Sequence, residues 1–374
     1  MRKDRVIVRH VIWTIGAGAL LAVSACGGTS NQNGGTSTTT GAGGGGSGGG
    51  GGEGGGRVVS TAEMVFMSPS GEVAVMNLDG SGNRELTSDG KQKFLPYFSP
   101  DGTRVVYTKF TVGGYGVPDS KSDIAIYDFT TEAETLITDT GGASQAAFSP
   151  DGQRLVYGSS TLTTASDGGR GVYVMDLDGS GSERIGGPSG KDDDQVWGDL
   201  AWSSDDWILF VVAQTIDGCF KTRLDKMRPD GTARTKVTDG GPSCTPQGFE
   251  QSGDADPGFS ADGKTIYSSR GFPTEPANAP PPTGPLTLTE RKLYAFSSEA
   301  WSAEKVEQDL SLPSQPDCIE GVPKGSPDGK RVLLFRMCFG DAGPAKGICV
   351  TDTAGSYRTR ITDGFGPDWN PVAR

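Results

Sequence analysis

Histidine is almost absent from this chain of 374 residues, because the only one is His10, close to the N-terminus. Without histidine the remaining chain has no Ser-His-Asp or Cys-His machinery, no imidazole general base and no His-ligated zinc or iron. A pair of carboxylates could still carry out glycoside chemistry without any other group. The sequence therefore predicts a non-catalytic protein and leaves carboxylate catalysis as the alternative.

Basic residues are in the minority, with 34 Lys and Arg against 46 Asp and Glu and a net charge of −12. Such a chain does not favour nucleic acid or anionic lipid headgroups. We expect cations or basic partners, and the alternative is that the charge serves solubility alone.

Long hydrophobic runs are also missing, and the most apolar stretch is 11–23. It follows four basic residues and is too short for a transmembrane helix, which is typical of a signal peptide. The next residues, Val23-Ser24-Ala25-Cys26, resemble a bacterial lipobox. That resemblance implies that residues 1–25 are removed and that Cys26 carries lipid. The alternative is an uncleaved membrane anchor.

Residues 26–56 begin at Cys26 and are then almost wholly Gly, Ser, Thr and Asn, so they cannot bury enough surface to fold. We expect a disordered tether with a reach of roughly 30 Å. The protein would then be exported and anchored by lipid at the cell envelope, on the outer membrane if there is one and otherwise on the outer leaflet of the plasma membrane.

A turn signature recurs along the rest of the chain, with Pro, Asp and Gly at the positions that tight turns favour. Its copies are Phe98-Ser99-Pro100-Asp101-Gly102, Phe148-Ser149-Pro150-Asp151-Gly152, Trp202-Ser203-Ser204-Asp205-Asp206, Phe259-Ser260-Ala261-Asp262-Gly263, Gly325-Ser326-Pro327-Asp328-Gly329 and Trp369-Asn370-Pro371. Strand-forming runs surround each turn and give four strands per repeat, which is a propeller blade.

The two ends of this repeat region complement each other. Residues 63–87 supply strands two to four of a blade, whereas residues 365–372 supply a first strand with nothing after it. Pairing of the ends would complete one blade and remove open sheet edges. We therefore predict an all-β fold, a six-bladed β-propeller of four-stranded antiparallel blades over residues 57–374, and expect it to be monomeric.

The aromatic-Ser-Pro-Asp-Gly turn and the Asp79-Gly80-Ser81-Gly82 hairpin resemble the TolB-type propeller repeat, a WD-repeat-like family. The resemblance covers essentially all of residues 57–374 and implies the fold more than the function. Unlike TolB, this chain shows no separate N-terminal α/β domain and has the lipid-anchor signal.

Acidic residues gather before the first strands of the fourth, fifth and sixth predicted blades, where connections would open on one face of the ring. We predict that they form an acidic rim that, with one tryptophan, contacts a ligand. The rim consists of Asp192, Asp193, Asp194, Trp197, Asp199, Asp254, Asp256, Asp317 and Glu320. It could hold calcium or receive a Lys/Arg-rich peptide, and the alternative is a solvated acidic surface. No other cofactor or metal is expected.

Besides Cys26 there are five cysteines, all in the second half of the chain. An exported protein can form disulfides, and an odd number leaves one cysteine over. We predict the pairs Cys338–Cys349 and Cys219–Cys244, although the order of strands also allows Cys318 to replace either partner.

Two functions remain from the sequence. The first is a lipid-anchored binding or scaffold module that engages a protein, peptide or envelope polymer through its loops. The second is a carbohydrate hydrolase or lyase that uses the rim carboxylates, with or without calcium. A tethered spacer that binds nothing is a third possibility.

Overall fold

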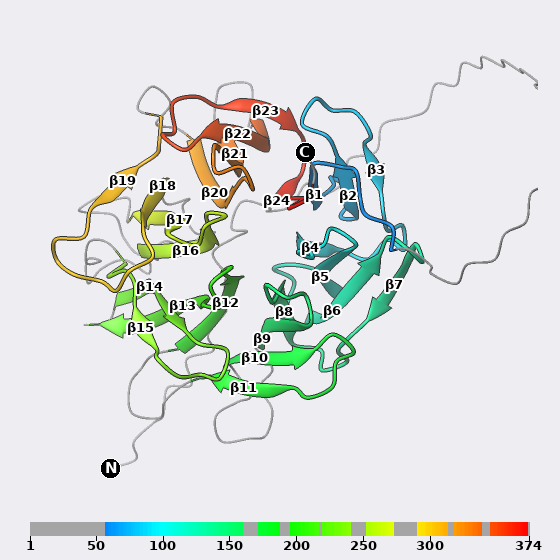
Figure 1. Ribbon diagram of the computed structural model, residues 1–374, viewed down its shortest axis with the longest axis horizontal. Coiled ribbons are helices and arrows are strands. Elements are labelled where there is room, and N and C mark those ends of the chain that lie inside the picture. The colour runs from blue at the N-terminus through cyan, green and yellow to red at the C-terminus, as the bar shows by residue number, and fades with distance from the viewer. Residues whose placement is uncertain are drawn as a thin grey trace, which may run out of the picture.

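The structure is a computed structural model that describes residues 57–159, 171–187, 195–216, 219–240, 252–272, 290–312, 318–338 and 345–372. These residues form strands, turns and irregular segments, and none of them lies in a helix. Consequently this part of the chain has no helix that could span a membrane. The all-β prediction is confirmed, and the sheets are arranged around a common centre (Figure 1).

One sheet contains strands from both ends of the described chain, in the order β24-β1-β2-β3. The members are β1 (Met64–Met67), β2 (Val73–Met76), β3 (Arg84–Glu85) and β24 (Phe365–Trp369). The pairing of β1 with β24 is antiparallel and places Met64 opposite Trp369. Asn370 extends this link, because its side chain donates hydrogen bonds to the carbonyl oxygens of Ser60 and Ala62.

Three further sheets have four antiparallel strands each. The second sheet contains β4 (Lys93–Phe98), β5 (Arg104–Val112), β6 (Lys121–Asp128) and β7 (Ala133–Leu136). The third contains β8 (Ala143–Phe148), β9 (Arg154–Ser159), β10 (Gly171–Asp176) and β11 (Glu183–Gly186). Another contains β20 (Cys318–Gly325), β21 (Arg331–Cys338), β22 (Ala345–Asp352) and β23 (Thr359–Thr362).

The remaining eight strands form one larger sheet, where we had expected two separate four-stranded units. Its strands are β12 (Gln195–Trp202), β13 (Ile208–Ile216), β14 (Cys219–Met227), β15 (Thr235–Lys236), β16 (Ser252–Phe259), β17 (Thr265–Phe272), β18 (Glu290–Ser297) and β19 (Glu307–Asp309). A two-residue parallel ladder joins β14 to β16. Gly253 permits it, because a Cβ there would lie 2.0 Å from the carbonyl oxygen of Thr222.

The five complete copies of the recurring turn are held by the same hydrogen bonds. In the first copy the Ser99 hydroxyl donates to Asp101 Oδ1 at 2.7 Å, and the Gly102 amide donates to the Ser99 carbonyl at 2.9 Å. Gly102 has φ +68°, a conformation that glycine adopts without steric cost. The turn therefore connects β4, β8, β12, β16 and β20 each to the strand that follows it in the sequence.

The antiparallel order defines two faces of the molecule. Turns after the first and third strands lie on one face, which we call the turn face, and connections after the second and fourth strands lie on the opposite loop face. The first strands, β4, β8, β12, β16, β20 and β24, are nearest the centre (Figure 1).

The hydrophobic core lies mainly between neighbouring sheets. One cluster joins Val156 of β9 to Phe210 of β13, and another joins Phe66 of β1 to Leu333 of β21. The turn aromatics add contacts of the same kind, since Arg154 lies 5.3 Å from the ring centroid of Trp202. Burial between sheets fixes each first strand and hence the residues at the centre.

Candidate functional site

The acids of the predicted rim that the structure describes are buried within strands and do not lie on exposed loops. Asp199 lies in β12, Asp254 and Asp256 lie in β16, and Glu320 lies in β20, with exposed fractions of 6%, 0%, 6% and 4%. Asp192, Asp193, Asp194 and Asp317 lie outside the described residues. Trp197 is in β12, but its side chain is outside what the structure describes. The expected position of the four described acids, in connections before the first strands, is therefore wrong, and their contact with a ligand stays a prediction.

Two of these acids form buried ion pairs across the sheet. Asp254 lies opposite Arg270, and Arg270 Nε is 2.7 Å from Asp254 Oδ1. Glu320 lies opposite Arg336 at 2.9 Å and also binds Arg358 at 2.7 Å. A buried carboxylate is tolerated when a charged partner neutralises it. These pairs account for the burial of both acids.

A β-bulge with a left-handed residue recurs at the same position of every first strand, three residues before the first residue of the turn signature. The register of each first strand shifts at this point. The residues, which we call the bulge ring, are Leu95 (φ 48°), Gln145 (φ 54°), Asp199 (φ 55°), Asp256 (φ 50°), Val322 (φ 52°) and Gly366 (φ 61°). A bulge re-aims a side chain, and positive φ is uncommon outside glycine. Its recurrence therefore marks a shared feature of the centre.

Members of the bulge ring on successive first strands contact one another. Gln145 Nε2 donates to Asp199 Oδ1, and the Asp199 amide donates to Gln145 Oε1. The Asp256 amide approaches Asp199 Oδ2 at 3.5 Å. On the other side, a Cβ at Gly366 would lie 3.1 Å from Leu95 Cδ2. The ring therefore consists of neighbouring residues from different first strands.

One half of the bulge ring is acidic and polar. Asp256 Oδ2 accepts hydrogen bonds from Ser269 Oγ at 2.7 Å and from Arg291 Nη1 at 3.3 Å. Burial, together with the charge of Asp256, raises the pKa of Asp199 to about 7. Asp199 therefore exchanges its proton near neutral pH.

The other half is apolar and aromatic. Leu95 and Val322 pack in one cluster with Phe94, Phe335 and Phe365. The Phe94 ring stacks at 5.3 Å on Phe365, and Phe365 meets Phe335 edge to face at 4.8 Å.

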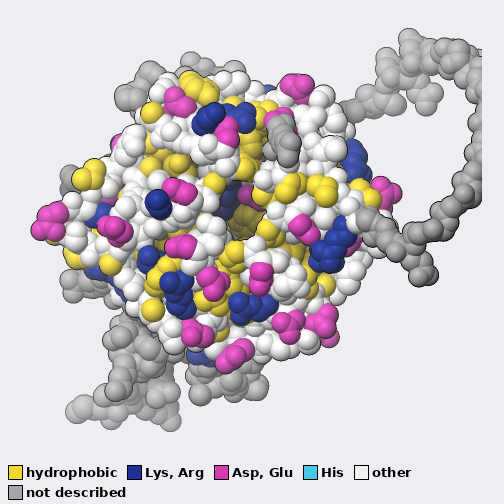
Figure 2. All heavy atoms as spheres, viewed as in Figure 1, with side chains coloured by type: hydrophobic (Ala, Val, Ile, Leu, Met, Phe, Trp, Pro, Cys, Tyr) yellow, Lys and Arg dark blue, Asp and Glu magenta, His cyan; other side chains and the backbone are white. Residues whose placement is uncertain are grey.

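Tyr115 extends this cluster toward the loop face, because it lies in the connection from β5 to β6 and its ring stacks on Phe94 at 4.8 Å. Figure 2 shows one face of the molecule hollowed at its centre, with hydrophobic side chains around much of the opening.

Two charged residues, Lys324 in β20 and Asp368 in β24, each lie two residues after the bulge. Lys324 Nζ donates to the Pro257 carbonyl at 3.1 Å and lies 4.6 Å from the ring centroid of Tyr97. Asp368 Oδ2 accepts a hydrogen bond from the Phe98 amide at 3.0 Å. Burial raises the pKa of Asp368 to about 6 and lowers the pKa of Lys324. The centre thus combines acids, two cations and aromatic rings in a partly desolvated space.

A calcium site was one expectation for the acidic residues. Among the residues that the structure describes, no group of three or more His, Cys, Asp or Glu side chains is placed to hold a metal ion. Calcium requires several oxygen ligands. Asp254, Asp256 and Glu320 are instead engaged by Arg270, Arg291, Arg336 and Arg358, and Asp199 accepts a hydrogen bond from Gln145.

The predicted disulfide between Cys338 and Cys349 is wrong, because the structure pairs Cys318 with Cys338. These two residues lie directly opposite each other in β20 and β21, with Cα atoms 4.0 Å apart. Ala345 faces Cys338 from β22, so Cys349 lies four positions further along, on the order of 13 Å away. Cys349 is a free, buried thiol. Cys26 and Cys244 lie outside the described residues, as does the side chain of Cys219, so the second pair stays a prediction.

Removing this disulfide is expected to lower stability. The double substitution Cys318→Ser/Cys338→Ser should reduce the free energy of unfolding by about 3 kcal/mol, because the bridge closes a loop of 20 residues. Urea unfolding followed by tryptophan fluorescence measures the change. Reductant should then destabilise the wild type more than the variant, and equal sensitivity to reductant would contradict a stabilising role.

Sequence reasoning missed Gln145, Arg291, Lys324 and Asp368, which complete the centre. A signal for the bulge is present, since proline follows Leu95, Asp256, Val322 and Gly366. Proline inside a strand pattern often marks a bulge or an edge. Aligning the repeats at this proline would have placed four of the six ring positions.

Comparison with known proteins agrees with the geometry of the sheets. In sequence, the chain is similar to the Tol-Pal system protein TolB of Anaeromyxobacter dehalogenans (strain 2CP-C), with 24% identity over 127 residues. This match covers 34% of the chain and only 26% of the relative.

Solved structures of similar fold include TolB from Acinetobacter baumannii, with a TM-score of 0.54 and 16% identity over 83% of this chain and 66% of that one. Oligogalacturonate lyase from Vibrio parahaemolyticus has a TM-score of 0.51 and 15% identity over 80% and 77%. Hydrazine synthase from Kuenenia stuttgartiensis has a TM-score of 0.58 and 13% identity over 84% and 48%. At such identities these likenesses show the fold alone.

The match to a family model covers more of the chain than the match to the TolB sequence does. The model described as the TolB beta propeller domain matches residues 57–270, which is more than half of the chain. This range includes the first four complete copies of the turn signature and the strands around them. The chain therefore belongs to the TolB beta propeller domain family.

Proposed function

We propose that the protein is a non-catalytic binding module of the cell envelope, which engages a protein, peptide or envelope polymer on the loop face at the centre. The observation that carries this proposal is the bulge ring, where six strands place an apolar half beside an acidic half. A rigid scaffold with both kinds of surface suits recognition of a partner with apolar and basic groups.

The architecture that supports this site is a closed ring of six four-stranded blades over residues 57–374. The six first strands with equivalent bulges support the blade count, and the pairing of β1 with β24 supports closure. In this interpretation the eight-stranded sheet is two blades that touch through the short β14–β16 ladder.

Membrane attachment through lipid on Cys26 is a further part of the proposal. The signal-like residues 1–25 and the Gly-rich residues 26–56 support export and tethering to the outer membrane, or to the outer leaflet of the plasma membrane where there is no outer membrane. The protein would act there as a monomer.

The contacts of the acids favour a binding function over carbohydrate hydrolase or lyase activity. A general acid or nucleophile must reach the substrate, whereas Asp254 and Glu320 are buried and bound by arginines. The fold shared with an oligogalacturonate lyase does not by itself carry that activity.

Site-specific photo-crosslinking in intact cells tests the binding site. A benzophenone amino acid at Val117, which is 52% exposed in the β5–β6 connection on the loop face, should capture a discrete envelope partner. The same probe at Val372, which is 39% exposed and lies against Gly102 on the turn face, is the matched control and should capture none.

Tyr115→Ala should reduce the yield from Val117 at least fivefold, because it removes the ring that stacks on Phe94. Thermal unfolding of this variant checks that the fold is retained. Equal capture from both probe positions would contradict a loop-face site, and turnover of envelope glycans by the purified protein would contradict a non-catalytic role.

A further inference from the structure

Positive charge is concentrated in one hairpin of this acidic protein. The hairpin β14–β15 and its turn carry six basic residues against two acids. The basic residues are Lys221, Arg223, Lys226, Arg228, Arg234 and Lys236. Because salt screens charges beyond about 8 Å at physiological ionic strength, a local cluster can attract an anion that the whole protein repels. The net charge therefore does not describe this surface.

Three of these cations lie against tryptophan rings. Arg228 Cζ is 3.8 Å and Lys226 Nζ is 4.4 Å from the Trp207 ring centroid. Lys236 Nζ is 3.8 Å from the ring centroid of Trp301. Two tryptophans are thus each paired with basic groups.

The two tryptophans belong to one continuous surface. Lys226 Nζ donates to the Ser298 carbonyl at 2.5 Å, and the Trp301 amide donates to the Lys236 carbonyl at 2.9 Å. Lys305 Nζ donates to the Val237 carbonyl at 2.9 Å. We call this surface the tryptophan patch, and its residues are Trp207, Lys226, Arg228, Lys236, Trp301 and Lys305.

The patch remains accessible and its cations keep donors for a ligand. Trp301 is 37% exposed, and Trp207, Lys226, Arg228 and Lys236 are partly exposed. Arg228 binds the Asp205 and Asp206 carbonyls through Nη1 alone, out of five N–H donors. Lys236 pairs with exposed Asp239 at 3.1 Å, an interaction of the kind that contributes little and exchanges readily.

We propose that the tryptophan patch is a second binding site, separate from the centre, for an anionic polysaccharide. Sugar rings present apolar C–H faces that pack on tryptophan, and carboxylate groups along the chain match the spaced Lys and Arg side chains. An acidic protein lacks the flat sugar faces, so the paired tryptophans favour the carbohydrate.

The protonation of Lys305 agrees with this assignment. Burial lowers the pKa of Lys305 to about 8, although the charge of Glu307 opposes this shift. An anion bound at the patch would favour the charged ammonium and raise this pKa.

The test uses the full-length protein in detergent micelles and measures binding to polygalacturonate, with neutral amylose as the uncharged polymer. The wild type should bind polygalacturonate with an affinity that falls as salt rises, and amylose at least tenfold more weakly. The single variant Lys236→Gln should weaken polygalacturonate binding. The double variant Lys236→Gln/Trp301→Ala should weaken it by at least tenfold.

The matched control combines Lys330→Gln with Tyr357→Ala, an exposed lysine and an aromatic that is 41% exposed elsewhere in the fold. It should bind as the wild type does. Equal binding by patch and control variants, or no binding by the wild type, would overturn the proposal. Equally tight binding of polyglutamate would overturn the carbohydrate assignment. Crosslinking from Val117 should be unaffected by the patch variants, which separates this site from the loop-face site.

Discussion

Lys93→Met is expected to lower the free energy of unfolding by about 3–5 kcal/mol, because it leaves the buried Glu72 carboxylate without its cation. Lys93 is fully buried at the start of β4, and its Nζ is 2.5 Å from Glu72 Oε2 and also binds Asp89. Chemical denaturation at neutral pH measures the loss.

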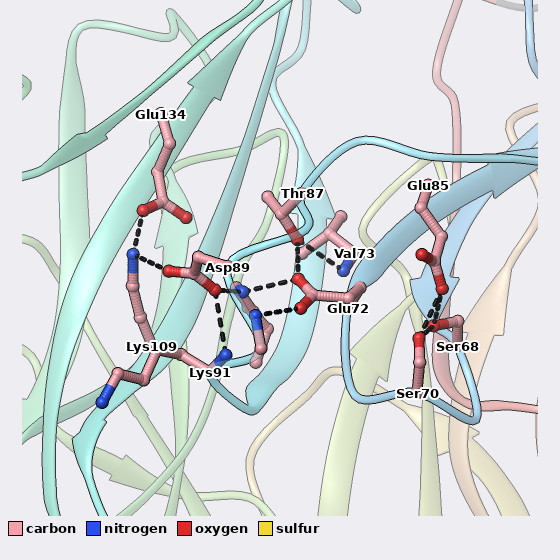
Figure 3. A network of polar contacts seen from close by, with 12 residues as sticks. Ser68, Ser70, Glu72, Val73, Glu85, Thr87, Asp89, Lys91, Lys109 and Glu134 are labelled. Atoms are coloured by element: carbon pink, nitrogen blue, oxygen red, sulfur yellow. Dashed lines mark hydrogen bonds and ion pairs between the residues drawn. The ribbon is translucent and has the colours of Figure 1, made fainter.

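The network around Lys93 explains why a lysine is buried there. Lys109 lies opposite Lys93 in β5 and pairs with Asp89 and Glu134, so two lysines share three carboxylates. Figure 3 shows the Lys109 ammonium between the carboxylates of Asp89 and Glu134. Glu72 also accepts hydrogen bonds from the Thr87 hydroxyl and the Gly90 amide.

Two variants control for this interpretation. Adding Glu72→Gln to Lys93→Met should restore part of the lost stability, since the amide oxygen keeps an acceptor for Thr87 without a buried charge. Lys91→Met, at the exposed neighbour, should change stability by less than about 0.5 kcal/mol. A loss as large for Lys91→Met as for Lys93→Met would contradict a specific role of the buried ion pair.

The repeated strands could be predicted because their signals are local. A turn such as Ser99 to Gly102 is determined by its own side chains, and the serine–aspartate bond forms within three residues. The link between β24 and β1 is not local, since Asn370 binds Ser60 and Ala62, which are 310 and 308 residues away. It could be predicted because the repeat leaves one blade without a first strand and one first strand without a blade.

The centre was harder to predict because its contacts join strands that are far apart in the sequence. Asp199 and Asp256 were placed in loops, since an acidic stretch resembles a solvated connection, whereas both lie in strands that continue inward. Their partners Gln145 and Arg291 are 54 and 35 residues away. The disulfide prediction was wrong for a related reason. The order of strands allowed either Cys318 or Cys349 as the partner of Cys338, and only the register places Cys318 opposite Cys338.

Asp199→Asn is expected to stabilise the protein at pH 8 by about 4 kcal/mol and to leave its stability at pH 4 nearly unchanged. The folded-state pKa of Asp199, about 7, is above the ordinary value, so the folded protein binds this proton more tightly than the unfolded chain does. Stability from this group is present below about pH 4 and is lost as pH rises toward 7. Asparagine keeps the acceptor for Gln145 and removes the charge next to Asp256.

The measurement is urea unfolding of the wild type and the variant at several pH values between 4 and 8, with the difference between them plotted against pH. Subtracting the curves cancels other groups, including Asp368, whose pKa is also raised. Asp178→Asn is the control, because its exposed carboxyl has a lowered pKa owing to the hydrogen bonds from Ser180 and should not reproduce the gain at pH 8. If the stability of the wild type and of Asp199→Asn depended on pH in the same way, Asp199 would stay ionised between pH 4 and 8. The acidic half of the bulge ring would then carry one more negative charge for a basic partner at neutral pH.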